Sequence, residues 1–140
     1  MILFLPIALC ILLLLSSMSD IQKRTIPNVI VVIILVLGIL YNLLHHSFYT
    51  ALIGIFIPSI LLLIAKSKFN YPIGAGDIKL LSAIGAWIGW LMNLYVLLLS
   101  CIIVLLYVLV LRLFFQTKVA SVPFAPFLSI STLICYVIAA

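Results

Sequence analysis

The stretch 80–111, LLSAIGAWIGWLMNLYVLLLSCIIVLLYVLVL, contains no charged residue and decides how the chain must fold. As a single helix its 32 residues would be about 48 Å long. A helix of that length fits a hydrocarbon layer about 30 Å thick only at a tilt near 50°, beyond the usual range. We therefore predict two helices with a break at Trp90-Leu91-Met92-Asn93. The first is short and begins at about Ile78, and the second covers 94–113.

The rest of the chain is equally apolar. Of its 140 residues, 69% are hydrophobic and 6% are charged, against about 45–50% and 25% in soluble domains. Four more apolar stretches are each close to the length that one membrane-spanning helix needs; they cover 2–18, 29–44, 48–65 and 120–140. Together with the two helices of the central stretch, they predict an all-α, polytopic membrane helix bundle. We expect about six transmembrane helices, forming a single domain over 1–140.

The basic residues predict how this bundle is oriented. With six spans, all seven Lys and Arg residues fall in alternate loops on one face, where the positive-inside rule places the cytoplasm. These residues are Lys23, Arg24, Lys66, Lys68, Lys79, Arg112 and Lys118. The opposite loops, 45–47 and the turn at Asn93, contain none, and a model with five spans would place Arg112 and Lys118 on the wrong face. We therefore predict a multi-pass protein of the cell (inner or plasma) membrane.

The same residues suggest which partners to expect. A net charge of +5, scattered in short gaps between apolar stretches, is typical of contact with the headgroups of a lipid bilayer, and we expect no nucleic acid partner. The cysteines are far apart inside apolar stretches, and His45 and His46 are adjacent residues whose side chains point apart. Neither pattern resembles a zinc site, so we predict no metal.

Asp20 and Asp77 are the only acidic residues of the chain. In the six-span topology both lie at cytoplasmic helix ends, where they can meet. Two carboxyl groups that share one proton can hydrolyse a peptide bond, because one activates water while the other protonates the carbonyl oxygen. Acidic residues at a membrane boundary generally indicate function. The alternative is that both are solvated charges paired with basic neighbours such as Lys23, Arg24 or Lys79.

The residues around the two acids favour a site. Asp77 ends the glycine-rich sequence Gly74-Ala75-Gly76-Asp77, with Lys79 two residues later. We predict that Asp77 is the N-cap of a helix, where backbone N–H groups and the positive helix end favour its ionised form. Asp20 would then hold the shared proton. Shortly after Asp20, Pro27-Asn28 predicts the start of the second span.

Together these motifs closely resemble the type IV prepilin peptidase family. One family signature is an Asp separated by five residues from Ile-Pro-Asn, matched here by Asp20 and 26–28, and the other is Gly-x-Gly-Asp followed by a Lys, matched by 74–79. The likeness continues through 79–89 and at Pro123-Phe124-Ala125-Pro126-Phe127. It therefore covers nearly the whole chain.

The resemblance implies an aspartic endopeptidase without cofactors. It implies cleavage, after a glycine, of the basic leader of type IV prepilins or pilin-like precursors at the cytoplasmic face. Asp20 and Asp77 carry over as the catalytic pair. The supporting residues that the likeness assigns to the loop and to the start of the second helix are Gly74, Gly76, Pro27 and Asn28. We add Lys79, two residues after Asp77, and expect it to lower the pKa of Asp77 or to attract lipid phosphates.

The chain departs from the family in two ways. Larger members carry a cytoplasmic insert with paired zinc-binding cysteines and also methylate the trimmed pilin. This sequence resembles the short, peptidase-only form, so we expect no methyltransferase activity and no S-adenosylmethionine. The second departure is Ala125, which stands where relatives commonly have Gly.

Gly85 and Gly89 form a Gly-x-x-x-Gly pair on the short fourth helix. Such pairs allow close helix packing in membranes. The pair predicts either a homodimer seam or packing against the first or sixth helix of the same chain.

A function of another class also fits two acids at a membrane boundary. The chain could be a small proton-coupled carrier or a non-enzymatic pilus-assembly membrane protein. In that case Asp20 and Asp77 would relay protons or pair structurally.

Overall fold

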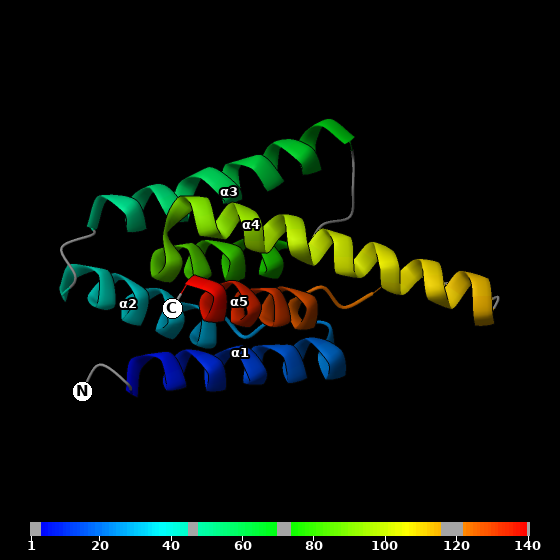
Figure 1. Ribbon diagram of the computed structural model, residues 1–140, viewed down its shortest axis with the longest axis horizontal. Helices are drawn as coiled ribbons and strands as arrows, with labels where there is room; N and C mark the ends of the chain where they lie inside the picture. The colour runs from blue at the N-terminus through cyan, green and yellow to red at the C-terminus, as the bar shows by residue number, and fades with distance from the viewer. Residues whose placement is uncertain (1–3, 45–47, 70–73, 116–121, 140) are drawn as a thin grey trace.

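The computed structural model describes residues 4–44, 48–69, 74–115 and 122–139. These residues form five helices, which are α1 (Phe4–Lys23), α2 (Asn28–Leu44), α3 (Phe48–Phe69), α4 (Ala75–Phe115) and α5 (Ala125–Ala139). The helices run along one another in a single bundle (Figure 1). The predicted all-α class is therefore confirmed.

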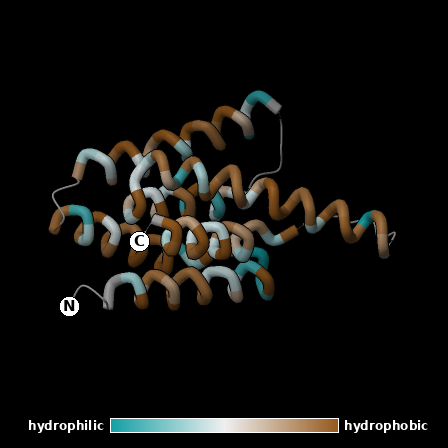
Figure 2. The backbone as a smooth tube through the Cα atoms, in the orientation of Figure 1, coloured by the Kyte–Doolittle hydropathy of each residue, from teal (hydrophilic) through white to brown (hydrophobic). Residues whose placement is uncertain are grey.

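Three helices are long and apolar enough to be candidate membrane spans, over Pro6–Lys23, Phe48–Lys68 and Ala75–Phe114. α2 and α5 are apolar but shorter. Hydrophobic residues dominate every helix along most of its length (Figure 2), and many large apolar side chains are exposed on the outside of the bundle. These features are those of an integral membrane protein, while the count of about six spans stays a prediction.

α4 contains a break at Gly89, where the backbone has φ 76° and ψ 176°. This region of backbone conformation is open essentially to glycine alone. The chain reverses there, so that a first arm (75–88) and a second arm (90–115) lie side by side in opposite directions (Figure 1). The break predicted at 90–93 exists, but it begins one residue earlier because only Gly89 can adopt this conformation.

Side chains satisfy the backbone carbonyls that the break leaves without helical partners. The Nδ2 of Asn42, from α2, donates to the carbonyl oxygens of Ala86 at 2.6 Å and Trp87 at 3.0 Å. The indole N–H of Trp87 donates in return to the carbonyl of Ile34 at 2.7 Å. α2 thus caps the first arm of α4.

Asn93 makes a second polar link in the same region. Pro58 has no backbone N–H, so the carbonyl of Gly54, four residues earlier in α3, has no helical donor. The Nδ2 of Asn93 donates to that carbonyl at 3.1 Å and to the carbonyl of Leu81 at 3.0 Å. Asn93 was predicted at a turn outside the membrane, but it is fully buried. It joins α3 to both arms of α4.

Gly85 is packed against α3. A Cβ added at Gly85 would overlap the carbonyl of Gly54, and one added at Gly54 would overlap that of Gly85. The close packing predicted for Gly85 and Gly89 therefore occurs within the chain, but against α3 and not against the first or last helix. Both glycines are buried, so neither is exposed as the seam that a homodimer would need. The homodimer itself stays a prediction.

The apolar core lies between α1, α2, α4 and α5, and its fully buried members include Leu13, Ile34, Leu81 and Leu128. Within the part of the chain that the structure describes, α1 packs against α2 and α5 but not against α4. The relative position of α1 and α4 is therefore set through α2 and α5. This matters because α1 carries Asp20 and α4 carries Asp77.

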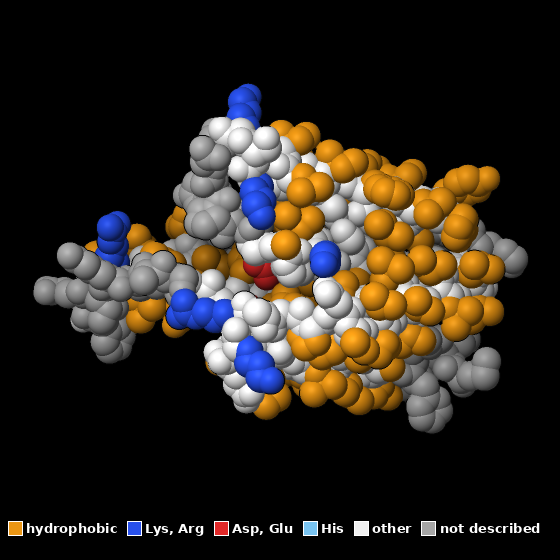
Figure 3. All heavy atoms as spheres, turned by 180° about the vertical axis from the view of Figure 1, so that it is seen from behind, with side chains coloured by type: hydrophobic (Ala, Val, Ile, Leu, Met, Phe, Trp, Pro, Cys, Tyr) orange, Lys and Arg blue, Asp and Glu red, His pale blue; other side chains and the backbone are white. Residues whose placement is uncertain are grey.

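The described basic residues gather at one end of the bundle. The last turn of α1 contains Lys23, that of α3 contains Lys66 and Lys68, and that of α4 contains Arg112. Arg24 follows α1, and Lys79 lies near the start of α4. In Figure 3 the Lys and Arg side chains surround the acidic one, away from the hydrophobic surface. The described basic residues thus lie at one end of the bundle, and the orientation of that end in the membrane stays a prediction. Lys118 and the loop 45–47 lie outside the described residues.

Candidate active site

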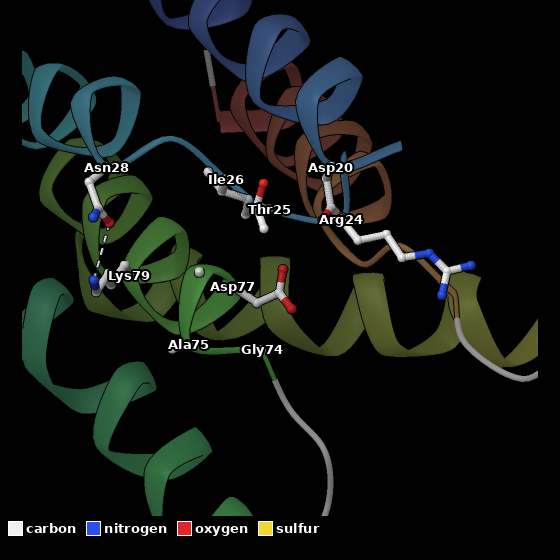
Figure 4. Close-up of a pocket in the computed structure, with 10 residues that line it drawn as sticks. Asp20, Arg24, Thr25, Ile26, Asn28, Gly74, Ala75, Asp77 and Lys79 are labelled. Carbon is white, nitrogen blue, oxygen red and sulfur yellow. Dashed lines mark hydrogen bonds between the residues drawn. The ribbon is translucent and has the colours of Figure 1, made fainter. Parts of the chain in front are cut away.

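An open pocket of about 270 Å³ lies at the charged end of the bundle. The residues that line it are Asp20, Arg24, Thr25, Ile26, Asn28, Gly74, Ala75, Gly76, Asp77 and Lys79. The two acids come from different helices and reach the pocket from opposite walls (Figure 4). The structure therefore brings together Asp20, Asp77 and every supporting residue predicted from the sequence except Pro27.

Asp20 lies in the last turn of α1 and is only 7% exposed. Its Oδ2 accepts a hydrogen bond of 3.1 Å from the backbone N–H of Ala125, the first residue of α5. A buried carboxyl group needs such a partner, because leaving it unpaired is costly. Asp20 is thus held by the N-terminus of a neighbouring helix.

The chain turns sharply after Asp20. Arg24 has a left-handed backbone, with φ 52°, and its N–H donates to the carbonyl of Asp20 at 2.9 Å, which ends α1. The Ser19 hydroxyl donates to the carbonyl of Thr25 at 2.9 Å. The carbonyl of Pro27 then accepts the N–H of Ile30 at 3.1 Å, so that α2 begins at Asn28 as the sequence predicts. This turn forms one wall of the pocket.

Asp77 forms the opposite wall, and the prediction that it caps α4 is wrong. The carbonyl of Gly74 accepts the N–H groups of Asp77 at 3.2 Å and Ile78 at 3.5 Å, so Gly74 is the capping residue and Asp77 is the third residue of the helix. Asp77 is partly exposed, and its carboxylate lies beside the backbone of Gly74, where an added Cβ would be 2.8 Å from Oδ2. Asp77 therefore does not cap α4, although it still lies in the first turn, near the positive helix end.

Two further contacts fix the first turn of α4 against the turn after α1. Gly76 faces Ile26, and a Cβ added at Gly76 would lie 3.4 Å from that side chain. The Nζ of Lys79 donates to Oδ1 of Asn28 at 3.1 Å (Figure 4). The two walls of the pocket are thus joined at the base of α2, and the basic residues Arg24 and Lys79 line the pocket together with the acids.

The reactive groups of the pocket are two carboxyl groups. Among the described residues, no three or more His, Cys, Asp or Glu side chains form a group that could hold a metal ion. The arrangement can take a proton from a water molecule at one carboxylate and deliver a proton from the other.

The sequence did not reveal the part that α5 plays. The amide of Ala125, which holds Asp20, belongs to no recognisable polar motif. A partial signal exists in Pro123 and Pro126, because prolines are common at helix starts, and a helix start presents free backbone N–H groups. Thr25 and Ile26 also line the pocket without having been predicted.

The fold and the pocket define a polytopic membrane protein with a candidate aspartic site. The sequence profile of the type IV leader peptidase family matches residues 7–109, which is most of the chain. This chain therefore belongs to the type IV leader peptidase family.

Curated relatives agree with this assignment. The chain is 32% identical over 127 residues to the prepilin leader peptidase/N-methyltransferase of Pseudomonas aeruginosa, covering 85% of this chain and 44% of the relative. It is 33% identical over 122 residues to the protein of the same name from Aeromonas salmonicida, covering 80% and 41%. For the Burkholderia pseudomallei protein of that name the identity is 37% over 89 residues, covering 59% and 29%. The chain spans less than half the length of these relatives, and no solved structure matches it.

Proposed function

We propose that this protein is a membrane aspartic endopeptidase that removes the basic leader from type IV prepilins or pilin-like precursors. The observation that carries the proposal is that Asp20 and Asp77 line one open pocket although α1 and α4 do not pack against each other in the described part of the chain. That the fold brings its only two acidic side chains into one pocket supports their joint use. Family membership supplies the substrate class.

The chemistry follows from two carboxyl groups that share one proton. The ionised carboxylate takes a proton from water as the water oxygen attacks the scissile carbonyl carbon, and the protonated partner gives its proton to the carbonyl oxygen. The tetrahedral intermediate then collapses. The C–N bond breaks, and the departing amine takes up the proton held by the base. The other carboxylate takes a proton back from a hydroxyl group of the intermediate. The pocket opens to the surface, so water and an unfolded peptide segment can both reach it.

The proposal is tested by changing each acid to its neutral isostere. Asp20→Asn and Asp77→Asn should each abolish leader cleavage of a co-expressed prepilin while the protein remains inserted in the membrane. Ser59→Ala is a suitable control, because Ser59 is polar and lies on α3, outside the pocket. Normal cleavage by either Asp variant would refute the protease assignment.

The proposal also includes the side of the membrane that the site faces and whether the cleaved pilin is then methylated. The gathering of basic residues at the pocket end supports a cytoplasmic active site. A reporter fused after Lys68 should be cytoplasmic and one fused at His46 should be outside, and the reverse result would contradict the orientation. We further propose trimming without methylation, so mass spectrometry of the cleaved pilin should show a new N-terminus with no added methyl group.

A further inference from the structure

The structure holds the two acids in different ways. Asp20 is 7% exposed and accepts the backbone N–H of Ala125 at the N-terminus of α5. Asp77 is partly exposed and lines the pocket beside Gly74, which is exposed. A backbone N–H at a helix N-terminus donates to a carboxylate and adds the positive end of the helix dipole, and both interactions favour the ionised carboxylate.

A second contact keeps α5 in register with α1. One helical turn below Asp20, the Ser17 hydroxyl donates to Oγ of Ser129 at 2.8 Å, and Ser129 lies one turn beyond Ala125 on α5. All four residues are buried. The two links, at successive turns of both helices, fix the N-terminus of α5 against Asp20.

α5 is also one of the elements that place Asp20 relative to Asp77. Within the described residues the backbone of α5 lies close to those of both α1 and α4, whereas no Cα atom of α1 lies within 8 Å of one in α4. A change at the N-terminus of α5 can therefore alter the contacts of Asp20 while the first turn of α4, which carries Asp77, stays in place.

We propose that the backbone N–H of Ala125, at the N-terminus of α5, is the positioning group that holds Asp20 as the ionised member of the catalytic pair. This inference rests on the proposed peptidase function. Asp20 is then the base that takes the proton from the attacking water, and Asp77 is the acid that protonates the scissile carbonyl oxygen. The roles are the reverse of those predicted from the sequence.

Other charged groups also line the pocket around Asp20. Asp77 and Lys79 face it from α4 and Arg24 from the turn after α1, since all of these side chains line the same pocket. Neither α2 nor α5 contains a charged residue. Asp77 also lies near a positive helix end, because it is in the first turn of α4 beside the backbone of Gly74. It is partly exposed, however, whereas the N–H of Ala125 donates to Asp20 inside the bundle, where a hydrogen bond to a carboxylate is stronger.

The test is to remove this one N–H and measure prepilin cleavage by the full chain across pH. Replacing Ala125 by its α-hydroxy acid analogue exchanges the N–H for an oxygen and keeps the methyl group. The acidic limb of the profile of kcat/KM against pH should move to higher pH by roughly one unit, because a charge-assisted hydrogen bond is lost. The basic limb should stay in place, since the group that ionises first controls the acidic limb of a coupled pair.

Ala125→Gly is the matched control, because it keeps the N–H and should keep both limbs in place. Ala125→Pro removes the N–H genetically and should move the acidic limb in the same direction. A fall in rate at all pH values with neither limb displaced would overturn the inference, and so would displacement of the basic limb alone. The proposed function fails separately, if the unmodified chain cleaves no prepilin or if Asp20→Asn cleaves normally.

Discussion

The first arm of α4 has a glycine at each end, and the two ends differ in how their polar groups are satisfied. At the Asp77 end, Gly74 is exposed and the carboxylate faces an open pocket. At the Gly89 end, the glycine is buried and the free carbonyls of Ala86 and Trp87 accept hydrogen bonds from Asn42. Polar groups are thus left accessible to water at the first end, while backbone carbonyls are satisfied inside the bundle at the second.

If the proposed function is correct, this difference means that the open end serves chemistry and the closed end serves the fold. A change at the closed end should lower the free energy of unfolding and, through it, the amount of folded protein. A change at the open end should lower the rate of cleavage at nearly constant stability. Variants on the same helix can therefore separate the two contributions.

The largest effect is expected from Gly89→Ala. An added Cβ would have room, since its nearest neighbour, Cβ of Thr50, is 3.6 Å away. The loss therefore comes from the backbone, whose φ of 76° and ψ of 176° should make an alanine there unfavourable by about 1–3 kcal/mol. Denaturant unfolding of the purified protein in detergent micelles measures this loss.

Gly76→Ala is the matched control at the open end. Its Cβ would lie 3.4 Å from Ile26, and alanine within a helix is favoured over glycine by about 1 kcal/mol. The Gly76→Ala protein should be at least as stable as the parent. Equal stability of the Gly89→Ala protein would show that the closed end is not a fixed element of the fold.

The next largest effect is expected from Asn93→Leu, which leaves the carbonyl of Gly54 without a donor. The loss should be about 1–2 kcal/mol, in the range for an unpaired buried polar group. The loss of stability is smaller than it would otherwise be, because Oδ1 of Asn93 is buried without a hydrogen-bond partner among the described atoms. Leucine removes that unpaired atom too. The free energy of unfolding measures the loss.

A double-mutant cycle with Pro58→Ala sharpens this test. Alanine restores a backbone N–H at 58 that can reach the carbonyl of Gly54, so it should recover part of the stability lost in Asn93→Leu. We expect a coupling energy of about 0.5–1.5 kcal/mol. Additive effects of the two changes would show that Asn93 does not replace the missing donor of Pro58.

The sequence predicted those parts of the molecule that depend on residue type and spacing. The apolar stretches predicted helices, and the motifs around Asp20 and Asp77 predicted a shared site. The length of the stretch 80–111 required a break, but length alone located it only to within a few residues. Its place at Gly89 depends on backbone conformation, which only glycine adopts there.

Other features depend on tertiary contacts that no local pattern reveals. Asn93 follows the break directly and resembled a turn residue, yet its partners belong to α3 and the first arm of α4. The amide that holds Asp20 belongs to Ala125, 105 residues away in the chain. Asp77 was misplaced as a cap because aspartate is favoured at that position, whereas the helix begins from the carbonyl of Gly74.

A moderate effect, on activity alone, is expected from Gly74→Ala. The added Cβ would lie 2.8 Å from Oδ2 of Asp77, which forces the carboxylate to move. Because small misplacements of catalytic groups slow reactions strongly, kcat/KM should fall about tenfold, with the free energy of unfolding changed by less than about 0.5 kcal/mol. Gly76→Ala, on the same wall of the pocket, should keep most of the activity. A Gly74→Ala protein that loses stability but not activity would reverse the assignment of the two ends.

The smallest effect is expected from Lys79→Met. Its Nζ donates to Oδ1 of Asn28 at 3.1 Å, and both side chains are exposed, so the bond should contribute less than about 1 kcal/mol to stability. Its loss should loosen the first turn of α4 against the start of α2 and lower kcat/KM a few-fold. Asn28→Ala should lower kcat/KM by a similar factor, and the double variant should be no slower than either single one, because both changes remove the same contact. Independent, multiplicative losses would instead indicate that the charge of Lys79 acts on the acids directly, and Lys79→Arg, which keeps the charge, would then retain full activity.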